Sequence, residues 1–368
     1  MSFYEDIVRY RDLDYQNCLS SVTDSQFYGI LEKPHLSDMD FLALLSPCAG
    51  QHLEEMAQKA HDITIRQFGR TIMLYTPMYL SNFCNNQCIY CGFNQKNKID
   101  RHQLSLEEVE KEALEISKTG LKHILILTGD APKIAGLNYL ESCCKILSRY
   151  FSSISIEVYA LTRDEYARLI QAGVDGLTIY QETYNEDLYG RLHLKGAKTD
   201  YRFRLDAPER GCEVAIRSVN IAALFGLDDW RKEAFLTGMH ADYLKKKYPE
   251  TEIAVSIPRI RPNAGEFQPK VIVEDRDVVQ MMTALRIFMP RTGITISTRE
   301  SAEFRNHILP LGVTKMSAGS CTAVGGRTSE NKRTGQFEIA DERGVPEMAA
   351  MLQASGWQAV YKDWQPIM

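Results

Sequence analysis

Short apolar runs alternate with amphipathic segments along most of the chain. Residues 123–128 contain Ile-Leu-Ile-Leu, the continuously apolar type expected for a strand that helices cover on both faces. By the same pattern, strands are expected at 71–75, 123–128, 153–159, 176–180, within 213–225, and at 252–257, 293–297 and 313–316. Helices are expected at 106–119, 137–150, 163–171, 200–210, where Gly211 would end the helix, 229–247, 274–288 and 302–307.

This strand–helix alternation repeats about eight times, which is typical of parallel βα units. It predicts an α/β fold with a TIM-type (βα)8 barrel over residues 71–318. Residues 1–70 are expected to form an N-terminal helical extension, in which 38–45 and 52–67 are amphipathic. Residues 319–368 are expected to form a C-terminal extension packed on the barrel.

Composition narrows the class of protein. The 368 residues carry 43 Lys and Arg against 48 Asp and Glu, a net charge of −5, which argues against a general nucleic-acid binder. No apolar stretch approaches the roughly 20 residues that cross a bilayer, and the N-terminus lacks a secretory signal pattern. We therefore expect a soluble, cytoplasmic protein with no membrane partner. Its nine cysteines, an odd number without a signal, do not indicate a disulfide framework.

Three cysteines form the most informative motif. Cys84, Cys88 and Cys91 follow the first predicted strand with the spacing C-x3-C-x2-C, where barrel enzymes carry active-site loops. Three thiolates can hold an iron–sulfur cluster while leaving one iron without a protein thiolate. A zinc site is the less favoured alternative, because it needs a fourth ligand. No second C-x2-C pair follows, and His102 stands eleven residues beyond Cys91.

The cysteine motif, with Tyr90 directly before its third cysteine, resembles that of the radical S-adenosylmethionine superfamily. Later segments resemble its tyrosine-lyase branch, in particular the 2-iminoacetate synthases of thiamine thiazole formation, over nearly the whole length. These segments are 180–185, 257–262, 297–300, 317–320 and 362–364.

The resemblance implies a 4Fe–4S cluster and S-adenosyl-L-methionine as cofactors, with a 5′-deoxyadenosyl radical as the reactive species. It implies cleavage of L-tyrosine between Cα and Cβ to 2-iminoacetate (dehydroglycine) and p-cresol. It also implies a thiazole synthase as partner protein and a flavodoxin or ferredoxin-type electron donor.

Residue roles follow from the same resemblance. Cys84, Cys88 and Cys91 would be the cluster ligands. The residues that would contact S-adenosylmethionine are Tyr90, Thr128, Gly129, Asp130, Glu182 and Arg204. Thr128 and Asp130 depart from the Gly-Gly-Glu-type turn of the family, so an ordinary turn in which Asp130 caps a helix stays open. Arg202 competes with Arg204 for the methionyl carboxylate.

Substrate residues are expected at the ends of later strands. Arg299 would bind the tyrosine carboxylate, with Ser297 beside it, while Ser317 and Tyr79 would lie near the amino group. Arg259 and Arg261 are alternatives that would otherwise tie the barrel mouth together.

Two rival functions remain. One is the tyrosine lyase of hydrogenase-cofactor maturation, whose C-terminal extension carries a second cysteine cluster; this chain has no cysteine after Cys321. The other is a non-catalytic iron–sulfur or zinc scaffold, which would have no need of Glu182, Arg204 and Arg299.

Overall fold

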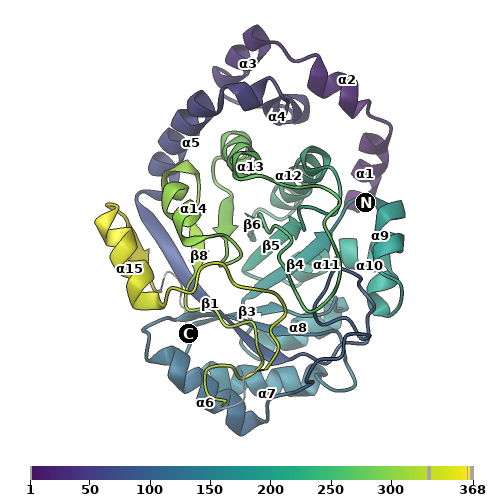
Figure 1. The fold of residues 1–368 in the computed structure, drawn as a ribbon, viewed down its shortest axis with the longest axis vertical. Helices are drawn as coiled ribbons and strands as arrows, with labels where there is room; N and C mark the ends of the chain where they lie inside the picture. The colour runs from purple at the N-terminus through teal and green to yellow at the C-terminus, as the bar shows by residue number, and fades with distance from the viewer. Residues whose placement is uncertain (1, 330–332, 363, 365–368) are drawn as a thin grey trace.

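The computed structural model describes residues 2–329, 333–362 and 364, and eight parallel strands form its centre (Figure 1). Each strand pairs with the next, and both β2 and β8 pair with β1, which closes the ring. The strands are β1(Thr71–Ser81), β2(His123–Thr128), β3(Ser153–Glu157), β4(Gly176–Glu182), β5(Ser218–Ala223), β6(Glu252–Ser256), β7(Gly293–Ile296) and β8(Lys315–Ser317). The predicted TIM-type (βα)8 barrel is confirmed.

Helices surround the barrel, and most of them lie where the apolar periodicity predicted them. They are α6(Leu106–Ser117), α7(Leu137–Leu147), α8(Arg163–Gln171), α9(Glu186–Leu192), α10(Tyr201–Leu205), α11(Ala207–Glu213), α12(Trp230–Lys247), α13(Asp275–Phe288) and α14(Ala302–His307). The short 3-10 turns are η1(Ala49–Gln51), η2(Ala197–Thr199) and η3(Leu309–Leu311).

The prediction of a single helix at 200–210 is wrong. The chain forms α10 and α11 instead, and Asp206 joins them. Pro208 has no amide hydrogen, so it suits the first turn of a new helix and not a helix interior. Gly211 lies inside α11, where a Cβ would stand 3.1 Å from Leu177 of β4. It therefore permits close packing of the helix on the sheet and does not end the helix.

The N-terminal helices pack on the barrel helices and share their hydrophobic core. They form an arc beside α12 and α13 in Figure 1 and comprise α1(Phe3–Arg11), α2(Tyr15–Ser20), α3(Asp24–Leu31), α4(Asp38–Leu44) and α5(Leu53–Phe68). The ring of Phe3 stacks on His240 of α12 with centroids 4.4 Å apart. Phe41 stacks on Phe288 of α13 at 4.5 Å. Within the described part of the chain, no helix combines the length and apolar character needed to cross a membrane.

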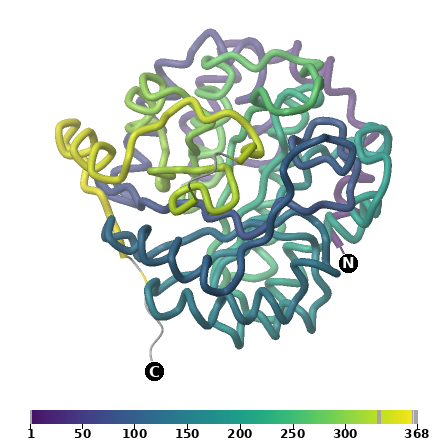
Figure 2. Tube along the Cα trace, turned by 60° about the horizontal axis from the view of Figure 1, so that its bottom comes forward, coloured from purple at the N-terminus to yellow at the C-terminus, as the bar shows by residue number. Residues whose placement is uncertain are grey.

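The C-terminal residues add two elements that the sequence pattern did not reveal, α15(Val345–Ala354) and β9(Gln358–Val360). Strand β9 pairs in parallel with residues 71–73 at the start of β1. Between β8 and α15, residues 318–329 and 333–344 lie on the same face of the molecule as the loop after β1 (Figure 2), and we call these residues the covering segment. Gln336 in this covering segment accepts a hydrogen bond from the Tyr79 hydroxyl at 2.7 Å. Asp363, part of the 362–364 motif, lies outside the described residues.

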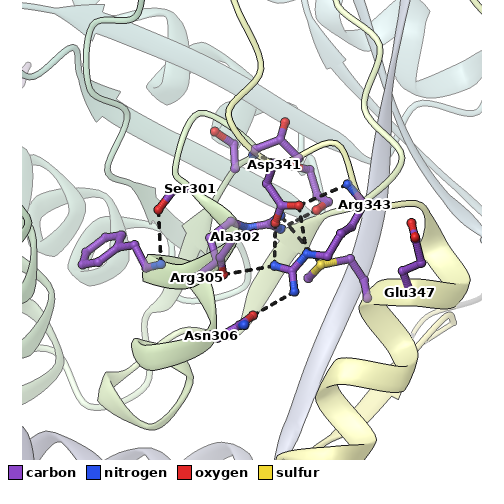
Figure 3. Close-up of polar contacts among 12 residues, drawn as sticks. Ser301, Ala302, Arg305, Asn306, Asp341, Arg343 and Glu347 are labelled. Carbon is purple, nitrogen blue, oxygen red and sulfur yellow. Dashed lines mark hydrogen bonds and ion pairs between the residues drawn. The ribbon is translucent and has the colours of Figure 1, made fainter.

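A buried ionic network fastens the covering segment to the barrel (Figure 3). Arg305 of α14 and Asp341 have fully buried side chains and form an ion pair. Arg305 also donates to the backbone carbonyl of Ser317 at the end of β8. Arg343 donates to Asp341 at 2.6 Å and to Asn306 at 2.8 Å. Arg305 thus bonds both to the end of β8 and to Asp341 of the covering segment, which connects the two.

Candidate active site

The three motif cysteines lie in the loop after β1, at the carboxyl end of the barrel. Cys88 is buried, Cys84 and Cys91 are partly buried, and all three are free thiols. The Tyr90 hydroxyl lies 2.7 Å from Nε2 of His193, and Cys88 forms an isolated antiparallel bridge with the same histidine. The cysteine loop therefore rests on the chain that follows α9.

The turn after β2 packs against the cysteine loop. A Cβ on Gly129 would stand 2.3 Å from the Phe83 carbonyl oxygen, so only glycine allows this approach. The Asp130 carboxylate accepts a hydrogen bond from Asn86 at 2.6 Å, and the residue that precedes α7 as its N-cap is Gly136. Asp130 therefore faces the cysteine loop instead of capping the next helix. The Thr128 hydroxyl beside it is buried without a hydrogen-bond partner.

The arrangement of the thiols fits a polynuclear cluster better than a single zinc ion. Tetrahedral zinc with Zn–S bonds of about 2.3 Å brings its sulfur ligands to about 3.8 Å from one another. Among the described residues, only Asp24, Cys48 and His52 bring three potential metal ligands within 4.8 Å of one another. The three motif thiols are spread more widely, as expected when each binds a different iron.

Glu182 is a buried carboxylate with unusual backbone geometry at the end of β4. Its φ is 72°, a left-handed value that is uncommon outside glycine, and the pairing of β4 with β5 shifts register just before it. Its Oε1 accepts a hydrogen bond from Lys198 at 2.5 Å and lies 3.9 Å from an Arg204 nitrogen. Burial favours a higher pKa for Glu182, but the positive charges of Lys198 and Arg204 outweigh it and lower the pKa below its ordinary value.

The two competing arginines occupy different environments. Arg204 is directed toward Glu182, and its Nε donates to the Tyr180 carbonyl at 3.0 Å. Arg202 lies over the ring of Tyr4 in α1, with its guanidinium carbon 3.4 Å from the ring centroid. The structure thus brings Arg204, and not Arg202, to the carboxylate at the end of β4.

A cavity of about 390 Å³ runs along the interior of the barrel, and all four expected substrate residues line it: Tyr79, Ser297, Arg299 and Ser317. The Arg299 guanidinium lies over Phe337 of the covering segment, 3.5 Å from the ring centroid. The hydroxyls of Ser297 and Ser317 accept hydrogen bonds from backbone amides. Ser297 accepts from the Arg299 amide at 3.3 Å, and Ser317 accepts from the Thr298 amide at 3.0 Å.

A smaller cavity of about 80 Å³ adjoins the barrel cavity beside Cys91 and Tyr90. Residues that line both cavities include Glu157, Arg299, Gln336 and Phe337. The predicted cofactor side and the predicted substrate side of the site therefore meet at Arg299.

The two remaining arginines differ in their contacts. Arg259 forms ion pairs with Glu300 and with Asp275, the latter at 2.7 Å, so it ties loops together at the barrel mouth. Arg261 lines the smaller cavity, and its Nε is buried without a hydrogen-bond partner.

Three residues of the site were not anticipated: Glu157, Lys198 and Gln336. Burial raises the pKa of Glu157 to about 7, although Arg299 opposes this shift. Glu157 ends β3, but the resemblance that implied a role for Glu182 implied none for a residue of this strand, which was predicted to continue to residue 159. Lys198 lies in η2 and Gln336 between β8 and α15, and only the folded chain reveals that both reach the site.

Comparison with known proteins relates this geometry to a family. A model of the radical SAM superfamily matches residues 78–238, and a model of the Biotin and Thiamin Synthesis associated domain matches residues 256–358. The chain is 38% identical over 360 residues to 2-iminoacetate synthase of Escherichia coli, covering 97% of this chain and 96% of that protein. Identity to the Salmonella typhimurium 2-iminoacetate synthase is 37% with the same coverage. The chain belongs to the 2-iminoacetate synthase family.

Solved structures of other enzymes share the fold of this chain. The FeFe-hydrogenase maturase HydG from Carboxydothermus hydrogenoformans superposes with a TM-score of 0.86 at 31% identity, covering 98% of this chain and 83% of that one. Methylornithine synthase, at 19% identity and a TM-score of 0.74, shares the fold. As a member of the 2-iminoacetate synthase family, the protein is a radical SAM enzyme, a class that implies a 4Fe–4S cluster and S-adenosylmethionine.

Proposed function

We propose that the protein is a carbon–carbon lyase that cleaves L-tyrosine at Cα–Cβ, giving 2-iminoacetate and p-cresol. The observation that carries this proposal is the junction of the two cavities at Arg299. A cavity of about 390 Å³ falls within the roughly 300–1,000 Å³ of small-molecule sites. A guanidinium at its rim suits the carboxylate of an amino acid.

The cofactors would be held by the cysteine loop, the turn after β2 and the end of β4, from which Tyr90, Cys91 and Glu182 line the smaller cavity. Cys84, Cys88 and Cys91 would ligate the 4Fe–4S cluster, and when bound this cluster and S-adenosylmethionine supply a carbon-centred radical. The remaining contacts to S-adenosylmethionine would come from Tyr90, Thr128, Gly129, Asp130, Glu182 and Arg204. The Arg261 Nε, which is buried without a hydrogen-bond partner, fits a polar ligand in this cavity, and the unpartnered Thr128 hydroxyl lies in the turn that packs against the cysteine loop.

The chain's own contribution is to bind, orient and exclude water. In this proposal, Arg299 binds the tyrosine carboxylate, while Ser297 and Ser317 fix the backbone turns around it through their hydroxyls. Tyr79 lies near the substrate and is itself fixed by Gln336 of the covering segment. Rigid placement in a dry barrel is what radical transfer over a short distance requires.

The test is an anaerobic reaction of the cluster-loaded enzyme with reductant, S-adenosylmethionine and tyrosine. The wild-type protein should form p-cresol and 5′-deoxyadenosine in step with each other. Arg299→Ala should keep the cluster and S-adenosylmethionine binding but raise the ratio of 5′-deoxyadenosine to p-cresol. Losing one partner of a buried charge pair costs about 2–5 kcal/mol. Arg299→Lys should recover little, because an ammonium cannot form the bidentate contact.

Arg202→Ala is the matched control, since that side chain packs on Tyr4. An unchanged product ratio in Arg299→Ala would remove Arg299 from the substrate site and make Arg261 the next candidate. A protein that cleaves neither tyrosine nor S-adenosylmethionine would instead be a scaffold.

Wider features of the proposal rest on family resemblance. We propose that a thiazole synthase consumes the 2-iminoacetate and that a flavodoxin or ferredoxin-type protein donates electrons, all in the cytoplasm. We also propose three functional regions, with the helical extension at 1–70, the catalytic barrel at 71–318 and the covering extension at 319–368.

A further inference from the structure

Outside the barrel, three side chains with metal-binding atoms meet in the N-terminal extension. Asp24 begins α3, Cys48 directly precedes η1 and His52 directly precedes α5. Nε2 of His52 lies 2.9 Å from the Asp24 carboxylate, and the Cys48 thiol donates to the same oxygen at 3.3 Å. Within the described residues, this is the one group of three such ligands whose binding atoms all lie within 4.8 Å of one another.

The imidazole of His52 is held with one ring nitrogen facing Asp24 and the other facing Tyr28 and Glu55. One face of its ring stacks on Phe27, with centroids 4.8 Å apart. Its Nδ1 lies 3.3 Å from the Tyr28 hydroxyl and 3.7 Å from the Glu55 carboxylate. Metal-bound histidines commonly donate their other ring nitrogen to a carboxylate, which leaves a lone pair on the binding nitrogen. Here the binding nitrogen would be Nε2. It donates its hydrogen to Asp24, so zinc binding requires this proton to move to Nδ1, which faces Tyr28 and Glu55.

We propose that Asp24, Cys48 and His52 form a binding site for Zn²⁺. One sulfur, one imidazole nitrogen and one carboxylate oxygen are all established zinc ligands, and three protein ligands leave a fourth position for water. Ion entry is open because the Asp24 side chain is 69% exposed. Binding replaces the thiol proton of Cys48 with zinc and releases this proton to the buffer. The bound ion would link the start of α3 to the start of α5, at the rim of the N-terminal arc (Figure 1).

The experiment uses the cluster-loaded enzyme under anaerobic conditions, so that the motif cysteines are occupied. Calorimetric titration with Zn²⁺ should give one ion per chain, with one proton released in buffers of different ionisation enthalpy. X-ray absorption at the zinc edge, which iron does not obscure, should find one sulfur at about 2.3 Å and imidazole nitrogen. Three sulfur neighbours would mean that zinc has displaced the cluster, and would overturn the proposal.

Variants assign the ligands. Cys48→Ser and Asp24→Asn should each weaken zinc binding by at least about 10-fold, and Glu55→Gln by about 10- to 100-fold through its effect on His52. Cys18→Ala, which removes another partly exposed thiol of the same extension, should leave affinity unchanged. All four variants should cleave S-adenosylmethionine at the wild-type rate. Wild-type binding weaker than about 1 mM, or equal affinity in Cys48→Ser, would show that the three side chains only hydrogen-bond to one another.

Discussion

Glu182 combines a left-handed backbone with a buried charge, and neither is favourable by itself. A non-glycine residue in a sparsely populated backbone region costs about 1–3 kcal/mol, and such residues gather at functional sites. The register shift before Glu182 and its contacts to Lys198 and Arg204 hold it in place. The surrounding structure thus stabilises a carboxylate that points into the smaller cavity.

We expect Glu182→Gln and Arg204→Ala to weaken S-adenosylmethionine binding by about 10- to 150-fold, the loss typical of a charge-assisted hydrogen bond. The cluster should remain, because Glu182 and Arg204 bond to Lys198, to the Tyr180 carbonyl and to each other, and not to the thiols of the cysteine loop. Equilibrium binding of S-adenosylmethionine to the cluster-loaded variants measures this. Arg202→Ala should bind normally, and a loss in Arg202→Ala with none in Arg204→Ala would reverse the assignment.

Alanine at Cys84, Cys88 or Cys91 should abolish the cluster and all cleavage of S-adenosylmethionine, because each substitution removes one of three anchors. Iron content and absorbance near roughly 400 nm measure the cluster. Cys143→Ala and Cys144→Ala, which change buried thiols of α7, should retain it. Full iron content in a Cys88 variant would contradict the ligand assignment.

At the scale of elements, the apolar pattern predicted the barrel because most strand residues are buried on both faces, while helices such as α6 and α8 bury one face. Arg299, which follows β7, was predictable because parallel strands carry function at their carboxyl ends, whereas Glu182, the last residue of β4, was implied by the family resemblance. Lys198 was not predictable, because it reaches Glu182 from η2, and Gly196 directly before η2 closely approaches Asn86 of the cysteine loop. Strand β9 was not predicted, because its three residues are too few to show the alternation of apolar and polar positions that indicates a strand.

Contact between the N-terminal arc and the barrel helices depends on Gly238 in α12. A Cβ there would lie 2.4 Å from the Phe41 ring, so Gly238→Ala should force α4 away and destabilise the protein by about 1–3 kcal/mol. Gly29→Ala in α3 is the control. Nothing lies within 4 Å of its added Cβ, and alanine should stabilise that helix by up to about 1 kcal/mol. Urea unfolding compares the two, and equal stabilities would show that α4 adjusts freely.

At the scale of the whole molecule, the covering segment completes a site that the barrel alone leaves open. The Gln336 side chain contacts Tyr79. Its backbone carbonyl oxygen approaches Gly92 of the cysteine loop so closely that a Cβ on Gly92 would be only 2.3 Å from it. Phe337 supplies the ring beneath Arg299. These contacts join residues far apart in sequence, so local patterns contain no signal for them.

Asp341→Asn should destabilise the protein by about 3–5 kcal/mol, because it leaves Arg305 buried without its charge partner. Glu347→Gln, at the exposed start of α15, should cost less than about 1 kcal/mol. Urea unfolding measures both. A loss in Asp341→Asn no larger than in Glu347→Gln would contradict the anchoring role.

The same network predicts a pH dependence. Burial favours a raised pKa for Asp341, but Arg343 and Arg305 outweigh it and lower the pKa. A lowered pKa in the folded state stabilises the protein above the ordinary carboxyl pKa of about 4, and this stabilisation is lost as the pH falls through the folded pKa. The stability difference between the wild type and Asp341→Asn should therefore shrink below about pH 4.

The parallel pairing of β9 with the start of β1 has a consequence for biosynthesis. Thr71 pairs with Gln358, and Met73 pairs with Lys315 on its other side. The ribosome releases the chain from its N-terminus, so β1 and the cysteine loop emerge long before the strands that close the ring beside them. The thiols of the nascent chain accordingly face solvent throughout most of translation. The interval for inserting a cluster into an uncovered site is therefore set by how long the ribosome takes to make the residues between Cys91 and Gln336, which covers the cysteine loop.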